Sequence, residues 1–121
     1  IDTESIQRVV QRLNNSVEKA EKDFGVAIDV QPISAESPVK LDDSICQVIE
    51  SLCQKHDINY MTMLSGAGHD SMNMAPLCPT AMIFTPSVAG ISHHPDEFTE
   101  FSDIAVAADL LAETLGTLAN Q

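Results

Sequence analysis

Three of the four histidines and three of the five glycines lie within residues 64–98, so the residue types that could do chemistry are concentrated there. His93 and His94 are followed closely by Asp96 and Glu97. An imidazole can bind a metal ion or carry a proton, and neighbouring carboxylates can orient it through hydrogen bonds. By spacing alone, however, a histidine in a turn is more often a surface residue than a ligand, and both carboxylates could simply precede the next helix.

Gly66 and Gly68 follow an apolar run at residues 60–64 and precede a helix-compatible segment at residues 69–75. This order predicts a strand, a tight turn and a short helix. Glycines let the backbone approach a bound group closely, and free N–H groups in such a turn favour an anion such as a carboxylate or phosphate. A dinucleotide site is disfavoured, because Ser71 breaks the Gly-x-Gly-x-x-Gly pattern and no Gly-Lys-Ser/Thr follows.

The same turn also has a purely structural interpretation, in which small residues are needed only to reverse the chain. Asp70 suits the start of the short helix as well as it suits a substrate contact. Ser65, His69 and Asp70 do not form a convincing nucleophile set, because Gly-x-Ser-x-Gly is absent and sequence neighbours rarely converge in space.

The elements around these residues are expected to alternate between helices and strands. Residues 26–31 alternate as a half-exposed strand does, and the apolar runs at residues 60–64 and 80–84 suit strands buried in a parallel sheet. Pro86 ends the last run, so the turn with His93 would lie at the carboxyl edge of the sheet, where open α/β sheets bind ligands.

Three stretches carry apolar residues at helical spacing. They begin near residues 2, 42 and 99, and Gly25 and His56 mark the ends of the first two. The expected N-caps are Asp2 or Thr3, Asp42 or Asp43, and Thr99 or Ser102. The serine-, glutamate- and proline-containing segment at residues 34–40 reads as a linker, which places a domain boundary near Pro38.

Acidic residues outnumber basic residues by 18 to 6, which opposes binding to nucleic acid and to anionic membrane surfaces. Three cysteines are an odd number, so a complete disulfide framework is excluded and a reducing, cytoplasmic compartment is favoured. Cys46, Cys53 and Cys78 are expected to be buried free thiols rather than a redox pair.

Three motifs occur in an order and spacing that resemble a known family: Ser65-Gly-Ala-Gly-His-Asp70, Pro79-Thr-Ala-Met-Ile-Phe84 and Gly90-Ile-Ser-His-His-Pro-Asp-Glu97. They resemble the C-terminal part of the carbamoylase and allantoate amidohydrolase branch of the metal-dependent aminoacylase and carboxypeptidase (zinc peptidase-like) family. The resemblance covers essentially the whole chain. Members of that family are much longer, and most of their metal ligands, together with the glutamate that acts as general base, lie upstream of the segment resembled here.

The resemblance implies an α/β fold in two parts. Residues 1–38 would be a partial lid or dimerisation domain, in which one helix and one strand form half of a smaller α+β sandwich. Residues 39–121 would be the C-terminal part of a hydrolase catalytic domain, with a three-layer-type, partial, parallel-leaning sheet flanked by helices. A homodimer is the implied assembly, including one formed by exchange of elements between subunits.

The implied activity of the longer parent is hydrolysis of a C–N bond in a carbamoyl or ureido compound, using two divalent metal ions such as zinc, manganese or cobalt. His93 corresponds to a metal ligand, and no catalytic residue falls within the chain, so this segment alone would be inactive. Gly66, Ala67, Gly68 and His69 correspond to the turn that binds the carboxylate of a small-molecule substrate. Asp70 and Glu97 would orient their neighbours by hydrogen bonding.

Two other classes of function remain open. A metal-dependent aminoacylase or dipeptidase would share the last histidine ligand, although it typically lacks the Ala-Gly-His-Asp motif. A stand-alone dimerisation or binding module without catalytic activity is the second alternative. The residues that would select the natural substrate, and those that would select the metal, lie mostly outside the chain.

Overall fold

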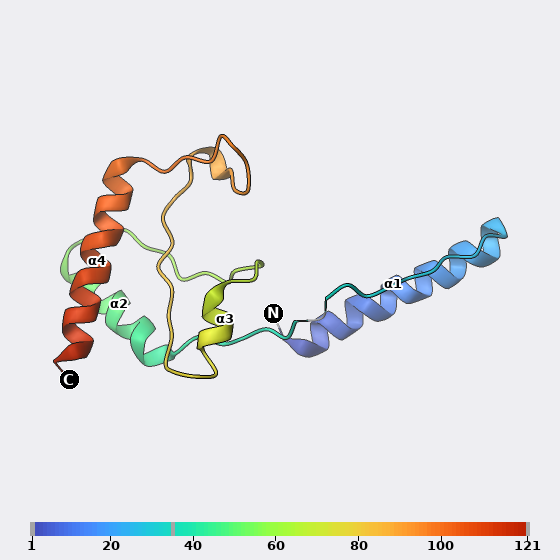
Figure 1. Cartoon of the computed structure of the whole chain (residues 1–121), viewed down its shortest axis with the longest axis horizontal. Helices are drawn as coiled ribbons and strands as arrows, with labels where there is room; N and C mark the ends of the chain where they lie inside the picture. Colours follow the sequence, from blue (N-terminus) through green and yellow to red (C-terminus); the bar gives the residue numbers. More distant parts are fainter. Residues whose placement is uncertain (1, 35, 121) are drawn as a thin grey trace. The chain divides into compact units, whose positions relative to one another are not determined.

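The computed structural model describes residues 2–34 and 36–120 (Figure 1). The helices are α1 (Thr3–Phe24), α2 (Asp43–Lys55), α3 (Asp70–Met74) and α4 (Phe101–Ala119), with one 3-10 turn, η1 (Val88–Gly90). The chain divides into two compact units, Ile1–Val39 and Lys40–Gln121. No helix among the described residues is long and apolar enough to cross a membrane.

Helix α1 begins and ends where its capping residues predict. The Asp2 carboxylate accepts a hydrogen bond from the Ser5 N–H at 2.7 Å, and Gly25 ends the helix with a φ of 64°. That positive φ suits glycine because it has no Cβ, and the Gly25 N–H donates to the Glu21 carbonyl at 2.9 Å. Both predicted caps of this helix are confirmed.

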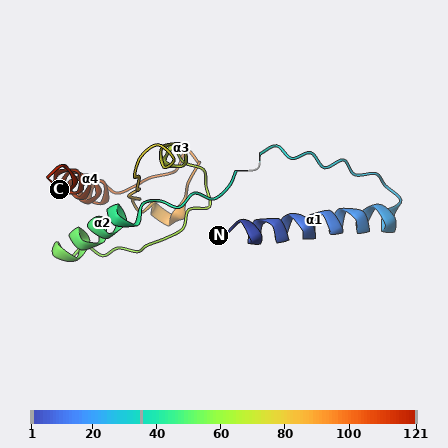
Figure 2. The same ribbon diagram turned by 90° about the horizontal axis from the view of Figure 1, so that it is seen from below.

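No residue of α1 is buried, so its apolar face has no cover within the described residues of its own unit. The following segment, residues 26–34, is extended and runs back in the direction of the helix start (Figures 1 and 2). The Ile28 N–H donates to the Glu21 carboxylate at 2.9 Å, which ties this segment to the last turns of α1.

Helices α2 and α4 pack against each other and form the core of the second unit (Figures 1 and 2). Leu52, Cys53 and Leu110 are its buried apolar residues. The buried Thr114 hydroxyl donates to the Leu110 carbonyl at 2.7 Å, so this polar group is satisfied inside the helix. Four partly buried apolar residues pack around this centre: Val48, Ile49, Ile58 and Ile83.

The predicted cap of α2 is confirmed and that of α4 is wrong. Asp42 caps α2 by accepting from the N–H groups of Ser44 and Ile45 at 2.9 and 3.0 Å. Helix α4 begins after Glu100, and no side chain caps it. Its first turn is instead closed by the backbone, with the Asp103 N–H donating to the Glu100 carbonyl at 3.0 Å.

An ionic cluster joins the end of α2 to α4. Glu113 accepts from the Lys55 ammonium at 2.5 Å, and its second oxygen lies 2.6 Å from Nε2 of His56. The hydrogen bond from Lys55 lowers the pKa of the Glu113 carboxyl group, and His56 lowers it further. This cluster therefore orients the two helices through charge at the rim of the small core.

The predicted α/β fold is wrong for the described residues, which form helices and no β-strand. Residues 26–31, 60–64 and 80–84 are extended as predicted, but no backbone ladder joins any of them to another. The parallel-leaning sheet and the helix-strand half-sandwich are therefore absent from this part of the chain.

The physical reason is that a strand exists only with a partner, whereas a helix satisfies its own backbone. The segments marked by the apolar pattern do not meet one another, so none of them becomes a strand. Side chains of residues 60–64 remain open, as Met61 at 77% exposure and Leu64 at 73% exposure show, whereas residues 80–83 are half-buried. The expectation of three buried thiols is also only partly met, since Cys53 is buried, Cys46 is half-buried and Cys78 is exposed.

Replacing Leu110 with alanine should lower the free energy of unfolding by about 2–5 kcal/mol, because Leu110 lies in the small core and leaves a cavity when truncated. Urea unfolding followed by helical circular dichroism measures the change. The matched control is Leu111→Ala on the same helix, since Leu110 is 7% exposed and Leu111 is 50% exposed. Equal losses for the two variants would contradict the packing of α2 on α4.

Replacing Glu113 with glutamine should destabilise the chain at neutral pH and have little effect in acid. Because folding lowers the pKa of Glu113, its contribution is present above the usual value of 4.5 and is lost as pH falls through the lowered value. Urea midpoints measured at about pH 7 and about pH 3 should therefore differ from the unsubstituted chain mainly at the higher pH. Asp109→Asn on the same helix is the control, and a pH-independent effect of Glu113→Gln would exclude the charge cluster.

Candidate functional site

The glycine turn at residues 65–69 is closed by the side chain of Ser65. The Ser65 hydroxyl lies 2.7 Å from Nε2 of His69, and it accepts a hydrogen bond from the Ala67 N–H at 3.2 Å. Ser65 and His69 are half-buried, and the residues between them are exposed. Ser65 and His69 thus meet, and no hydrogen bond among the described residues joins Asp70 to either of them. That the three residues do not form a nucleophile set stays a prediction. The spacing of Ser65 and His69 across a glycine turn was the available signal.

Two side-chain contacts fasten this turn and α3 to the extended segment at residues 80–84. The His69 ring meets the Phe84 ring edge to face, with centroids 5.4 Å apart and planes at 65°. The Ser71 hydroxyl contacts the Met82 sulfur at 3.1 Å. Sequence reasoning did not foresee the role of Phe84, because nothing local relates position 84 to position 69.

His93 lies in a second turn, in a left-handed backbone conformation with a φ of 55°. Its N–H donates to the Glu97 carboxylate at 2.9 Å, and the Glu97 N–H donates to the His94 carbonyl at 3.0 Å. His94 accepts through Nδ1 from the Asp96 N–H at 3.2 Å. Glu97 therefore fixes the backbone of His93 and makes no hydrogen bond to its imidazole. This loop is closed at its base by the Val88 N–H, which donates to the Phe98 carbonyl at 2.8 Å.

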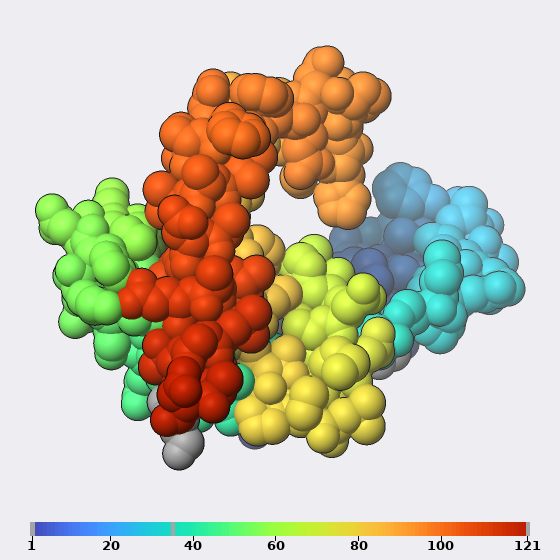
Figure 3. All heavy atoms as spheres, turned by 60° about the vertical axis from the view of Figure 1, so that its left-hand side comes forward, coloured from blue at the N-terminus to red at the C-terminus, as the bar shows by residue number. Residues whose placement is uncertain are grey.

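The structure brings some of the predicted site residues together and leaves others apart. Gly66, Ala67, Gly68 and His69 share one turn, and Asp70 is the first residue of α3. No hydrogen bond or ion pair in the described part of the chain links this turn to His93. Figure 3 shows the yellow-green segment with the glycine turn and the orange segment with His93 as separate projections of the surface.

Within residues 2–34 and 36–120, no group of three or more histidine, cysteine, aspartate or glutamate side chains comes together as a metal site. Structural and catalytic zinc ions in proteins take three or four protein ligands. The single imidazole that the family resemblance offers, that of His93, is not a sufficient donor set. The residues present therefore do not fit a two-metal centre by themselves.

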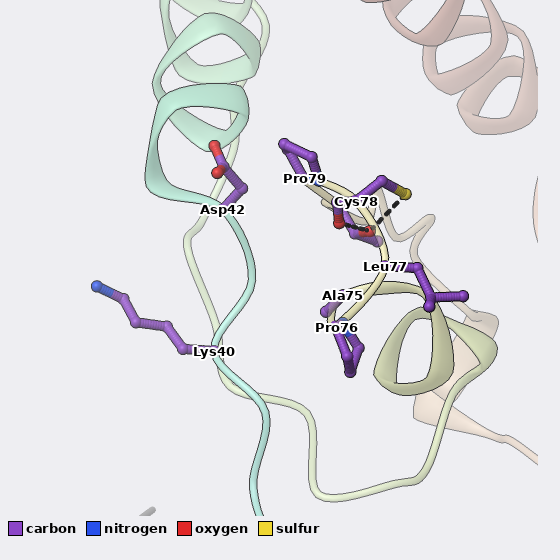
Figure 4. A pocket seen from close by; sticks show the side chains of 8 residues that line it. Lys40, Asp42, Ala75, Pro76, Leu77, Cys78 and Pro79 are labelled. Carbon is purple, nitrogen blue, oxygen red and sulfur yellow. Dashed lines mark hydrogen bonds between the residues drawn. The ribbon is translucent and has the colours of Figure 1, made fainter.

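An open pocket of about 330 Å³ lies beside the loop that follows α3, and none of the predicted site residues lines it (Figure 4). Its walls are Lys40, Asp42 and residues 75–80. Asp42 is engaged in capping α2, and the Thr80 hydroxyl donates to the Cys78 carbonyl at 2.8 Å. Lys40 extends away from the loop in Figure 4 and pairs with Asp43 at 2.5 Å. The pocket offers no polar group aimed at a ligand, and we assign it no function.

Comparison with known proteins identifies the class. Residues 4–117 match the model of peptidase family M20/M25/M40, and the chain belongs to this family. It is 37% identical over 120 residues to the allantoate amidohydrolase of Escherichia coli (strain K12), covering 99% of this chain and 29% of that protein.

Two further relatives are also named as hydrolases of carbamoyl or ureido compounds. The N-carbamoyl-L-amino-acid amidohydrolase of Paenarthrobacter aurescens is 31% identical over 115 residues, covering 95% of this chain and 28% of that protein. The ureidoglycolate hydrolase of Oryza sativa subsp. japonica is 30% identical over 122 residues, covering 100% of this chain and 25% of that protein. The chain thus spans between a quarter and three tenths of the length of these relatives.

Proposed function

We propose that this chain is the C-terminal part of a larger hydrolase that cleaves a C–N bond of a carbamoyl or ureido compound. The observation that carries the proposal is the alignment of nearly the whole chain with an allantoate amidohydrolase at 37% identity. The relatives named for N-carbamoyl-L-amino acids and for ureidoglycolate support the same bond type, because a carbamoyl or ureido group lies next to a carboxylic acid in each of these compounds.

In the proposed enzyme His93 supplies one ligand to a pair of divalent metal ions, with zinc, manganese and cobalt as the candidates. The remaining ligands and the general base come from sequence outside residues 1–121. Glu97 holds the backbone of His93 in its left-handed conformation and so supports the presentation of the imidazole. We derive no chemical step from this incomplete set of donors.

The turn at residues 66–69 is the proposed binding site for the substrate's carboxylate. The Ala67 N–H is excluded as a donor to the substrate, because it already donates a hydrogen bond to the Ser65 hydroxyl. The N–H groups of Gly66, Gly68 and His69 make no hydrogen bond within the described residues, so they are the amides of this turn left to receive an anion. Asp70 opens α3 beside them.

The proposed parent is a cytoplasmic homodimer with a separate lid or dimerisation domain at residues 1–38. The odd number of cysteines supports a reducing compartment, because a complete disulfide framework needs an even number. The uncovered apolar face of α1 supports a role for residues 1–38 in contacts with a second subunit or with the rest of the parent.

The decisive experiment uses the longer protein whose coding sequence contains this chain. Release of product from N-carbamoyl-L-amino acids, allantoate and ureidoglycolate is compared with release from N-acetyl-L-amino acids and dipeptides. Faster turnover of the first group supports the proposal. Activity on acylated amino acids or dipeptides alone would make the protein an aminoacylase or dipeptidase. This is the main alternative function, because the matching family is named for peptidases.

Replacing His93 with alanine in that protein should lower both kcat/KM and bound metal by about 100-fold or more, because loss of a direct ligand costs at least as much as loss of a residue that orients one. Metal content measured by elemental analysis accompanies the assay. His94→Ala is the matched control, since the polar contacts of this neighbouring imidazole within the described residues are with Asp96. If the two variants lose the same activity and metal, His93 is not a ligand.

A further inference from the structure

We propose that one face of α4 is a docking surface for an apolar part of the same polypeptide that lies outside residues 1–121. We call this face the open row, and it consists of Phe101, Ile104, Ala108, Leu111 and Leu115. The proposal rests on the proposed function in one respect, because both need the chain to be part of a longer protein. The cleavage of a C–N bond is not needed for it.

The open row follows the repeat of the helix. Its residues are alternately three and four positions apart, so they line one face of α4. All five are exposed, and the exposed fractions of the large side chains are 81% for Phe101, 46% for Ile104, 50% for Leu111 and 59% for Leu115. A single exposed apolar residue is ordinary, whereas a continuous stripe along a helix marks an interaction site.

The row of α4 that is turned to the core is the less apolar of the two. It has the same spacing and contains the buried Leu110 and Thr114, with Asp103, Ala107 and Thr117 half-buried. Leu110 is its one large apolar side chain. Because burial stabilises in proportion to the apolar area removed from water, covering the open row would contribute more than the contact that α4 already makes. The helix is therefore oriented for a second contact.

The charges of α4 disfavour a second copy of the helix as the occupant. Its charged residues are Asp103, Asp109 and Glu113, and none of them belongs to the open row. Two such helices placed face to face would bring acidic side chains together with no basic residue to offset them. The open row itself needs an apolar surface, and its acidic surroundings suit neutral or basic residues at the edge of that surface.

The lengths of the relatives indicate where such a surface can come from. The aligned region is 29% of the allantoate amidohydrolase of Escherichia coli and 25% of the ureidoglycolate hydrolase of rice. A longer protein of this kind has enough additional residues to form an apolar surface against α4. An occupant on the same polypeptide also avoids the loss of translational freedom that accompanies binding of a separate protein.

Hydroxyl-radical footprinting of the longer, unsubstituted protein tests the proposal, with the modified residues located by mass spectrometry. The rate at each residue is compared with its rate in urea-unfolded protein. Phe101 and Leu115 should react about tenfold more slowly or less in the folded protein, because the occupant excludes water from them. Val106 is the matched control, since it is 44% exposed on the same helix and lies outside the open row. Open-row residues that react as fast as in the unfolded protein overturn the proposal.

Photo-cross-linking identifies the occupant. A Leu115→benzoylphenylalanine variant should form a cross-link within one chain, to a peptide outside residues 1–121. A cross-link to a second copy, or to a peptide within residues 1–121, overturns the proposal. The protection seen in the unsubstituted protein provides a test that needs no variant, because an occupant on the same chain protects equally at every protein concentration. Protection that disappears on dilution points to a second copy and overturns the proposal as well.

The two levels of inference can fail separately. Footprinting needs no substrate, so inactivity on every carbamoyl and ureido compound refutes the proposed function and leaves the docking surface to be decided by the footprint. An active protein whose open row is unprotected refutes the docking surface and leaves the proposed function intact. A coding sequence that supplies no residues outside 1–121 overturns both.

Discussion

Among the described residues, the buried apolar side chains gather where α2 packs on α4. Leu52, Cys53 and Leu110 are buried there, and the charge cluster around Glu113 holds the helices at the rim. Burying a leucine side chain contributes about 1.5–3 kcal/mol, whereas each ordered residue costs about 1–2 kcal/mol of backbone entropy. A core this small leaves most of the remaining segments to be ordered by local hydrogen bonds.

Both candidate segments are ordered in this local way. The turn with His69 is closed by Ser65 and leans on Phe84, and the loop with His93 is closed by Glu97 and by the backbone bond from Val88 to Phe98. Each loop is closed by hydrogen bonds between residues at most ten apart, and the first is also held by the His69–Phe84 ring contact and, through α3, by the contact of Ser71 with Met82. Short-range bonds fix the shape of each loop, but they cannot bring the two loops together. That task needs a rigid layer beneath them, which the described residues do not form.

The positions of the longer helices could be predicted from the sequence, because the hydrogen bonds and caps of a helix join residues that are close along the chain. Asp2, Gly25 and Asp42 act as the caps their residue types predict, whereas the sheet required pairing between segments 26–31, 60–64 and 80–84 that no local pattern can guarantee. Apolar side chains of residues 26–31 and 60–64 remain exposed, whereas residues 80–83 are half-buried. In two of the relatives, 71–75% of the protein lies outside the aligned region. A longer protein of this kind has enough additional residues to pack against the exposed apolar side chains.

The turn with Ser65 shows where residue types alone mislead. The type and spacing of Ser65 and His69 do not by themselves reveal that the two side chains meet. In the structure the Ser65 oxygen accepts from the Ala67 N–H and lies within hydrogen-bond distance of Nε2 of His69. These two contacts join the beginning, the middle and the end of the glycine turn. The value of Ser65 to the turn is therefore that one short polar side chain closes a segment of small, exposed residues.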